Sequence, residues 1–500
     1  MTASNPQLRI ATLERELHWA DLKIQSLIEE MRQLRIKFLG PKSETLSSLQ
    51  LELLAEEEPS ATRDEVEAEA RRDPLTRTPA RERKPHPGRK PLPENLPRVE
   101  EVIACVRCTC AACGGETAVI GYDESELLDV EQAHYFVRVT KREKRACRRC
   151  ESAPVIAAPL AERIVEKGLA SDAVVINTVV GKYCDHLPLY RQAVMLEREA
   201  GVEIGRATLD GWVMRVGELL APVIAAMRRD LLNATYLQAD ETTVPVQMHD
   251  KRGENHQAYL WQYGKPGGET VFEFQLGRGR EGPRKFLAQW EGVLQTDGYQ
   301  AYDDVGGPKL VQVGCWAHAR RKFVDAVKLN PKDAEAIAMV TRMDALFLID
   351  RDARQRELSA DERLAQRRQY ADEWLAGTHE TCLRLSREAL PKSALGQAVS
   401  YTLNQWPKLR RCFDYAEVEL SNNLAENSMR PVALGRKNWL HVGSPQSGPK
   451  VAAILSVVES CRRLVVPVKE YLAAVLPGLN RRTLSQVANL TPSRWAASRR

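Results

Sequence analysis

The chain has 500 residues, of which 43% are hydrophobic and 28% charged, so it can bury a core and is not disordered throughout. At roughly 100–200 residues per domain, such a length suggests about three domains. The net charge of +5 is small, and the absence of an apolar run of about 18 residues argues against a membrane span and a membrane partner. The N-terminus lacks a charged-then-apolar signal pattern, so we expect a cytoplasmic protein.

A heptad pattern extends from Ile10 to Phe38, with apolar residues at alternating spacings of three and four. This is the a/d pattern of a coiled coil. Charged residues around the seam favour a self-associating zipper at residues 1–40, and hence a homo-oligomer, over a single helix packed on its own protein. Residues 41–100 are rich in proline and arginine and predict a flexible linker, which either follows DNA phosphates or is simply solvated.

Cysteines cluster between residues 105 and 150, where six of the 11 are found. Two C-x₂-C pairs separated by 33 residues have the spacing that holds a structural Zn²⁺ tetrahedrally. Cys105 and Cys108 are an alternative first pair, but Gly114 and Gly115 favour Cys110 and Cys113, which directly precede them. We therefore predict a zinc-ribbon-like domain at residues 101–155, with reduced cysteines without metal as the alternative. The favoured zinc ligands are Cys110, Cys113, Cys147 and Cys150.

Residues 160–232 predict a helical region, and residues 189–213 within it have the pattern of a helix-turn-helix. One helix ends at Ala200-Gly201, and Arg206 begins the next. In such motifs the first residues of the second helix contact DNA, so Arg206 and Thr208 are candidate DNA-binding residues. Two ordinary packed helices are the alternative interpretation.

Strand-like alternation begins at residue 236, and residues 233–328 predict the first part of a catalytic core. The expected order β-β-β-α-β-α-β-α indicates an α/β fold with a mixed sheet whose faces are covered by helices. Residues 329–420 predict a helical insertion, residues 421–475 the last part of the core with a glutamate-bearing helix, and residues 476–500 a basic tail. The expected strands are residues 236–246, 257–264, 270–277, 292–298 and 309–315.

Three carboxylates stand out in this core. Asp240 occupies a strand position where a hydrophobic residue would pack, although a single aspartate often just ends a strand. If the fourth strand lies parallel beside the first, Asp297 at its end approaches Asp240. Asn423, Glu426 and Arg430 share one face of the later helix by their spacing. Such acids repel one another unless cations hold them, and two Mg²⁺ (or Mn²⁺) ions about 3.5–4 Å apart would do so.

Four segments of this core resemble the bacterial insertion-sequence family 66 transposases: ADETTVPV (239–246), LQTDGYQAYDDV (294–305), CWAHARRKF (315–323) and residues 422–444. The resemblance extends to the zipper, the cysteine pairs and HLPLYRQ (186–192). It implies an RNase H-like fold and a DDE strand-transfer mechanism, with Asp240, Asp297 and Glu426 as the metal-binding triad. Asn427 departs from the family pattern, where arginine is more usual.

Other residues near these acids are candidates for supporting roles. Cys315 and His318 form a C-x₂-H at the end of the fifth strand, either near the site or as a packed thiol and a helix-start histidine. Asn423 is a further candidate for site support. Basic side chains flank the proposed metals and are expected to bind DNA phosphates, although a solvated helix face explains either cluster alone. They are Arg320, Arg321, Lys322, Arg430, Arg436 and Lys437.

The leading hypothesis is a transposase that binds the terminal inverted repeats of its element, cuts at their 3′ ends with Mg²⁺ and joins them to target DNA. Its partners would be double-stranded DNA, a second copy of the chain and accessory proteins of the same element, with nucleoid association when DNA is bound. One alternative is a catalytically inactive, sequence-specific DNA-binding regulator of transposase origin. Another is a ribonuclease H that acts on RNA–DNA hybrids.

Overall fold

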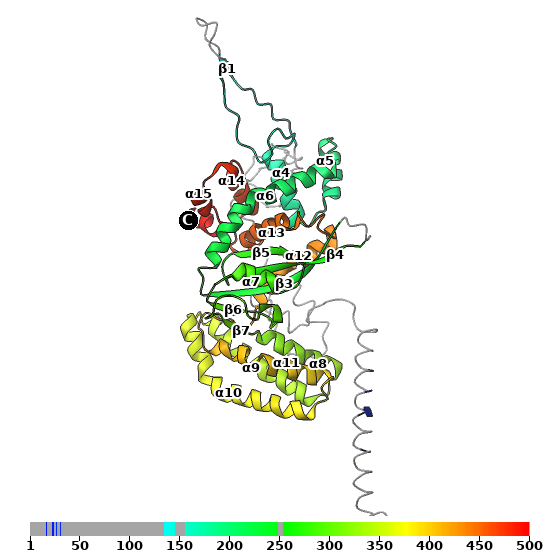
Figure 1. Cartoon of the computed structure of the whole chain (residues 1–500), viewed down its shortest axis with the longest axis vertical. Helices are drawn as coiled ribbons and strands as arrows, with labels where there is room; N and C mark the ends of the chain where they lie inside the picture. Colours follow the sequence, from blue (N-terminus) through cyan, green and yellow to red (C-terminus); the bar gives the residue numbers. More distant parts are fainter. Residues whose placement is uncertain are drawn as a thin grey trace, which may run out of the picture. The chain divides into compact units, whose positions relative to one another are not determined.

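The computed structural model describes residues 135–145, 156–248 and 254–499, together with Leu17, Lys23, Ile24, Leu27 and Met31 (Figure 1). These five separate residues are helical and exposed, as a zipper requires, but the rest of the zipper, the linker and the proposed zinc ligands lie outside the described residues. Contacts divide the chain into two units, of which residues 71–141 form the smaller. In that unit the described residues 135–141 are exposed and form neither helix nor strand.

The first described element of the larger unit is a short antiparallel pair formed by β1 (Lys144–Arg145) and β2 (Ile156–Ala157). Three helices follow: α4 (Asp172–Tyr183), α5 (Leu189–Ala200) and α6 (Arg206–Leu231). Helix α5 ends where Gly201 adopts a left-handed φ of 62°, a conformation that glycine adopts without steric cost. The predicted end of the first helix and the start of the second are therefore confirmed.

A five-stranded mixed sheet forms the centre of the larger unit. Its strands are β3 (Tyr236–Val246), β4 (His256–Gly264), β5 (Thr270–Gln275), β6 (Val293–Gln295) and β7 (Val311–Val313). They lie in the order β5-β4-β3-β6-β7. The first three are antiparallel, whereas β6 pairs parallel with β3 and β7 parallel with β6. The predicted mixed sheet, with its fourth strand parallel beside its first, is confirmed.

The connection between β6 and β7 differs from the prediction of a helix. It holds only η1 (Gln300–Tyr302), a single 3-10 turn. Left-handed backbone interrupts this segment at Gly298 (φ 92°), Asp304 (φ 54°) and Gly306 (φ 77°), and an α-helix cannot continue through such residues. Helices α7 (Glu281–Leu287) and α8 (Trp316–Leu329) form at their predicted places.

The predicted insertion is helical and consists of α9 (Ala334–Gln355), α10 (Ala360–Glu388), α11 (Ala394–Leu409) and the 3-10 turn η2 (Arg410–Phe413). Its core includes residues of the sheet and of α8, and Trp316 makes edge contacts with Trp374 and Trp406 at centroid distances of 4.9 and 5.8 Å. The insertion therefore packs against α8 and against the edge of the sheet that β7 forms (Figure 1).

Helix α12 (Asn423–Trp439) follows the insertion, and Val442 then bridges to Val246 at the end of β3. The buried helix α13 (Gly448–Arg463) covers the edge strand β5, where Ser460 and Ser456 accept hydrogen bonds from the backbone N–H groups of Thr270 and Phe272 at 2.9 and 2.8 Å. These bonds satisfy edge groups that would otherwise be open to a further strand. Among the residues that the structure describes, no helix has the length and apolar composition to cross a membrane.

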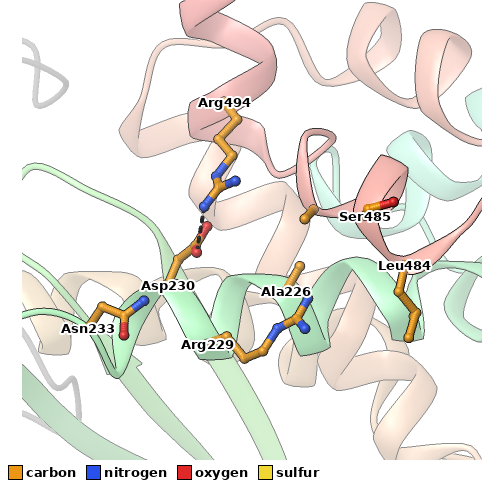
Figure 2. A pocket seen from close by; sticks show the side chains of 8 residues that line it. Ala226, Arg229, Asp230, Asn233, Leu484, Ser485 and Arg494 are labelled. Atoms are coloured by element: carbon orange, nitrogen blue, oxygen red, sulfur yellow. Dashed lines mark hydrogen bonds and ion pairs between the residues drawn. The ribbon is translucent and has the colours of Figure 1, made fainter.

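The C-terminal residues fold onto the core as α14 (Val468–Val475), η3 (Leu479–Arg481), α15 (Leu484–Ala488) and α16 (Pro492–Ala497). The basic tail expected from the sequence is therefore ordered over its described residues, because Trp495 is buried against Tyr471. A hollow of about 430 Å³ lies between α6, α15 and α16, where Arg494 pairs with Asp230 at 2.8 Å (Figure 2). None of the proposed catalytic acids lines it.

Candidate active site

Asp240 lies on the central strand β3, on the face that looks toward the start of α12. Alternate residues of a strand share a face. On that face, Tyr236 donates to Oε1 of Gln295 at 2.5 Å, and Gln238 donates to the carbonyl of Ser421 at 2.9 Å. Asp240 is the next residue in this row, beyond the last pairing of β3 with β6. Asp240 is half-buried and therefore lies at the end of the sheet where the parallel pairing of β3 with β6 stops.

Asp297 lies two residues after β6, in the turn that ends this strand. Its Oδ1 accepts the backbone N–H of Tyr299 at 2.8 Å, which is the local bond that aspartate makes in turns. Its backbone carbonyl accepts the hydroxyl of Tyr401, from α11 of the insertion, at 2.5 Å. Both the side chain and the main chain of Asp297 are thus fixed.

Glu426 lies in the first turn of α12, where a negative charge is favourable. Its Oε2 accepts from Nη2 of Arg321 at 3.1 Å, and its Oε1 lies 3.5 Å from Nε2 of His318. Burial lowers the pKa of His318, although the charge of Glu426 opposes this. Helix α8 therefore places the guanidinium of Arg321 and the weakly basic imidazole of His318 beside Glu426.

The three acids form one electrostatic cluster. The pKa of Asp240 lies well above its ordinary value, first because the group is buried and then because Glu426, Glu241 and Asp297 are close enough to repel its charge. Asp240, Asp297 and Glu426 are far apart in the sequence, and the fold brings them to one end of the sheet. Divalent cations would relieve this repulsion.

Carboxylate oxygens are the donor set that Mg²⁺ prefers, so the chemistry of the three residues fits this ion. In the part of the chain that the structure describes, however, no three His, Cys, Asp or Glu side chains surround a common point as metal ligands do. In this arrangement Glu426 contacts Arg321, and Asp297 accepts a backbone N–H. The three carboxylates fit Mg²⁺ chemically, but their side chains would have to rotate to bring their oxygens around one ion.

Glu241 has different partners from Asp240, as expected for the next residue of a strand. Its buried carboxylate accepts from Arg278 at 2.7 Å and from the hydroxyl of Tyr302 at 2.9 Å. Burial raises the pKa of Glu241, whereas the hydrogen bond from Arg278 lowers it. The charge of Asp297 raises this pKa further. Glu241 therefore contributes charge to the cluster while its oxygens are engaged elsewhere.

The candidates for site support lie close to Glu426. Cys315 precedes α8 and is fully buried, and its sulfur accepts the backbone N–H of Asn422 at 3.4 Å. Burial, followed by the charge of Glu426, raises the pKa of the Cys315 thiol to about 12, so the thiol stays protonated and packs beneath α12. Asn423, in the first turn of α12, is also buried.

The basic residues expected to bind DNA do not share one environment. Arg320 is wrongly placed in that set, because it is 1% exposed and its guanidinium pairs with Asp344 of the insertion. Arg436 is engaged too, donating to the hydroxyl of Thr243 at 2.6 Å. Arg321 contacts Glu426, as described above. Of the six residues, Lys322, Arg430 and Lys437 are exposed.

The remaining predicted site residues are those at the start of α6 and the four proposed zinc ligands. Arg206 and Thr208 are exposed in the first turn of α6, while Leu209 and Trp212 anchor that helix in the core. Thr208 also lines a hollow of about 540 Å³. Cys110, Cys113, Cys147 and Cys150 lie outside the described residues, so the choice between them and the Cys105/Cys108 pair stays a prediction.

Tyr401 is a contact of the site that sequence reasoning did not identify. It is one of several aromatic residues in a charged, helix-forming segment, and no spacing distinguishes it from those that only pack. Its role depends on how the insertion folds back onto the turn after β6.

The sheet and the cluster define an α/β protein with a carboxylate centre flanked by cationic side chains. The chain belongs to the IS66 transposase family. The family model described as "Transposase IS66 family" matches residues 167–450, which include all three acids. The model described as "zinc-finger binding domain of transposase IS66" matches residues 107–151, and "Transposase C of IS166 homeodomain" matches residues 26–100.

Curated relatives come from Sinorhizobium fredii (strain NBRC 101917 / NGR234). The chain is 33% identical to "Uncharacterized protein y4jD" over 81% of its own length and 82% of the relative. It is 32% identical to "Uncharacterized protein y4hP" over 95% of its length and 88% of that relative. These similarities cover nearly the whole of both proteins, in agreement with the family models.

Proposed function

We propose that the chain is a DDE transposase that binds the terminal inverted repeats of an insertion sequence, cleaves the 3′ ends and transfers them into target DNA. The observation that carries this proposal is the convergence of Asp240, Asp297 and Glu426. Burial raises the pKa of Asp240, and the nearby charges of Glu426, Glu241 and Asp297 raise it further. Membership of the IS66 transposase family supports the same assignment.

The sheet supports an RNase H-like core. Three antiparallel strands are followed by two that add parallel to the first of them, and the acids come from the central strand β3, the end of β6 and a helix after the insertion. In this arrangement Asp240 lies on β3 and Asp297 in the turn that follows the neighbouring parallel strand β6, so the pairing of the two strands brings both residues to the same end of the sheet.

Asp240, Asp297 and Glu426 would hold two Mg²⁺ (or Mn²⁺) ions, which supply activation of the attacking oxygen and stabilisation of the leaving oxygen at phosphorus. The remaining groups of the chain would orient the DNA. Exposed Lys322 on α8 and exposed Arg430 and Lys437 on α12 would provide positive charge for backbone phosphates. Arg321 balances the charge of Glu426 until the site is loaded.

Recognition of the DNA ends is assigned to the N-terminal half of the chain. The match to a zinc-finger model supports a structural Zn²⁺ held by Cys110, Cys113, Cys147 and Cys150. The exposed start of α6, with Arg206 and Thr208, supports a DNA contact of the helix-turn-helix kind. A zipper at the N-terminus would pair two copies and so bring two DNA ends together.

The test is Mg²⁺-dependent strand release from a labelled DNA fragment that carries an element end. The Asp297→Asn variant should bind the fragment like the unmodified chain but release no nicked strand. Asp304→Asn is a matched control, because this exposed residue lies in the same connection and pairs with Arg280. Binding without strand release by the unmodified chain would instead favour the inactive DNA-binding regulator.

A further inference from the structure

Helix α11 of the insertion contacts the turn that carries Asp297 at three successive points. The hydroxyl of Tyr401 donates to the carbonyl of Asp297 at 2.5 Å. One helical turn later, Nε2 of Gln405 lies 3.4 Å from the carbonyl of Gly298. Near the end of the helix, Nζ of Lys408 pairs with Asp303 at 2.7 Å. The spacing of these residues places them on one face of α11.

The turn needs such support because its backbone is irregular. Gly298 has a φ of 92°, which residues other than glycine rarely adopt, and the adjoining segment up to β7 has only the short turn η1. Few of its backbone groups are fixed by a sheet or helix. The carbonyl of Asp297 is satisfied by the insertion, and a shift of this carbonyl would move the attached side chain.

Tyr401 is itself held in place and stays a donor. Its ring lies under the ammonium of Lys322, with Nζ 5.4 Å from the ring centroid. A tyrosine hydroxyl keeps its proton at neutral pH, so Tyr401 remains the donor of its bond to Asp297. Helix α11 also packs on α8 through Trp316 and Trp406, which ties the insertion to the helix that bears His318 and Arg321.

We propose that Tyr401 is a positioning residue, through which the insertion holds the backbone at Asp297 and directs its carboxylate toward Asp240 and Glu426. The insertion is then part of the active centre and more than a spacer between β7 and α12. The inference deepens the proposed function and rests on it, because the geometry that Tyr401 maintains is that of the proposed metal-binding acids.

The experiment compares the full-length chain with Tyr401→Phe, which removes one hydroxyl and keeps the ring. Strand release should fall about 10- to 100-fold, as expected when reacting groups are displaced by about 1 Å. The KM for end DNA should stay unchanged. Mn²⁺ affinity, measured by calorimetry without DNA, should weaken about 5-fold, the effect of losing one typical hydrogen bond. Gln405→Leu should act in the same direction.

Tyr370→Phe is the matched control, because Tyr370 is an exposed tyrosine of the same insertion and is 49% exposed. Melting temperatures of all variants identify any that fail to fold, in which case Gln405→Leu carries the test.

If Tyr401→Phe and Gln405→Leu fold and match the unmodified chain in both strand release and Mn²⁺ affinity, the positioning role is overturned. If the unmodified chain binds Mn²⁺ but releases no strand, the proposed function fails, and the Mn²⁺ titration alone decides the role of Tyr401. An unmodified chain that does neither overturns both.

Discussion

Arg321 and Glu426 join helices α8 and α12 through a contact of 3.1 Å between Nη2 and Oε2. The same carboxylate belongs to the acidic cluster that raises the pKa of Asp240. As a ligand of a divalent cation, Glu426 would have to exchange partners, and the guanidinium of Arg321 would compete with that cation.

Replacing Arg321 by Gln should tighten Mn²⁺ binding about 5-fold, since a partly exposed ion pair contributes about 1 kcal/mol at most and each 1.4 kcal/mol is tenfold in affinity. Calorimetric titration of the full-length chain measures this. Arg410→Gln serves as the control, because Arg410 is exposed on η2. Unchanged or weaker affinity in Arg321→Gln would show that Arg321 supports the loaded site and does not compete with it.

Gly298→Ala should reduce strand release at least 10-fold and leave end binding intact. An added Cβ would lie 2.6 Å from the side chain of Gln405, and the φ of 92° is strained for alanine. Gly267→Ala is a matched control, because Gly267 also has a positive φ (68°) but its Cβ would meet nothing within 4 Å. Equal rates for the two variants would show that neither the backbone conformation at position 298 nor the contact with Gln405 affects the site.

Asp350→Asn should lower the free energy of unfolding by about 3–5 kcal/mol, the usual cost of leaving a buried charge without its partner. Asp350 is 6% exposed and accepts from Nε of Arg367 at 2.9 Å and from Nε of Arg354 at 3.1 Å. Asp352→Asn alters an exposed carboxylate that pairs with Arg356 and accepts from Gln366, and should change stability by less than about 1 kcal/mol. Urea unfolding followed by tryptophan fluorescence compares them, and similar losses would contradict the importance of burial.

The same carboxylate makes stability depend on pH. Burial acts to raise the pKa of Asp350, but Arg367 and Arg354 outweigh it and hold the pKa below the ordinary value of 3.8. The folded chain then takes up this proton less readily than the unfolded chain, so the stabilisation is present above about pH 4 and is lost as pH falls through the lowered pKa. Urea midpoints at pH 6 and pH 3 should differ more for the unmodified chain than for Asp350→Asn. Equal differences would assign the acid sensitivity to other groups.

Zinc content tests the cysteine assignment. Cys110→Ser and Cys147→Ser should each lower bound zinc from about one ion per chain toward zero, because a structural site needs all four ligands. Cys105→Ser should leave it unchanged, and Cys184→Ser is a control in a described cysteine that forms no disulfide. Elemental analysis of the purified chain gives the content. Zinc lost from Cys105→Ser and retained in Cys110→Ser would move the first pair to Cys105 and Cys108.

The sequence by itself determined the local structure of the core and indicated Asp240, Asp297 and Glu426 as candidate metal ligands. Alternation predicted the strands from residue 236 onward, and Gly201 and Arg206 marked the helix boundaries, because hydrophobic period and end signals are local properties. The segments around Asp240, Asp297 and Glu426 were distinctive enough to predict the family that the comparisons confirm.

Only the tertiary structure decided which side chains were available. Arg320 and Arg321 are adjacent and equally charged in the sequence, but successive residues of a helix point about 100° apart. Arg320 is therefore buried against Asp344, whereas Arg321 contacts Glu426. Tyr401 meets Asp297 across a separation of 104 residues, which no local pattern encodes. The partners of a polar group depend on how distant elements pack, and packing of the insertion against the sheet is a property of the whole fold.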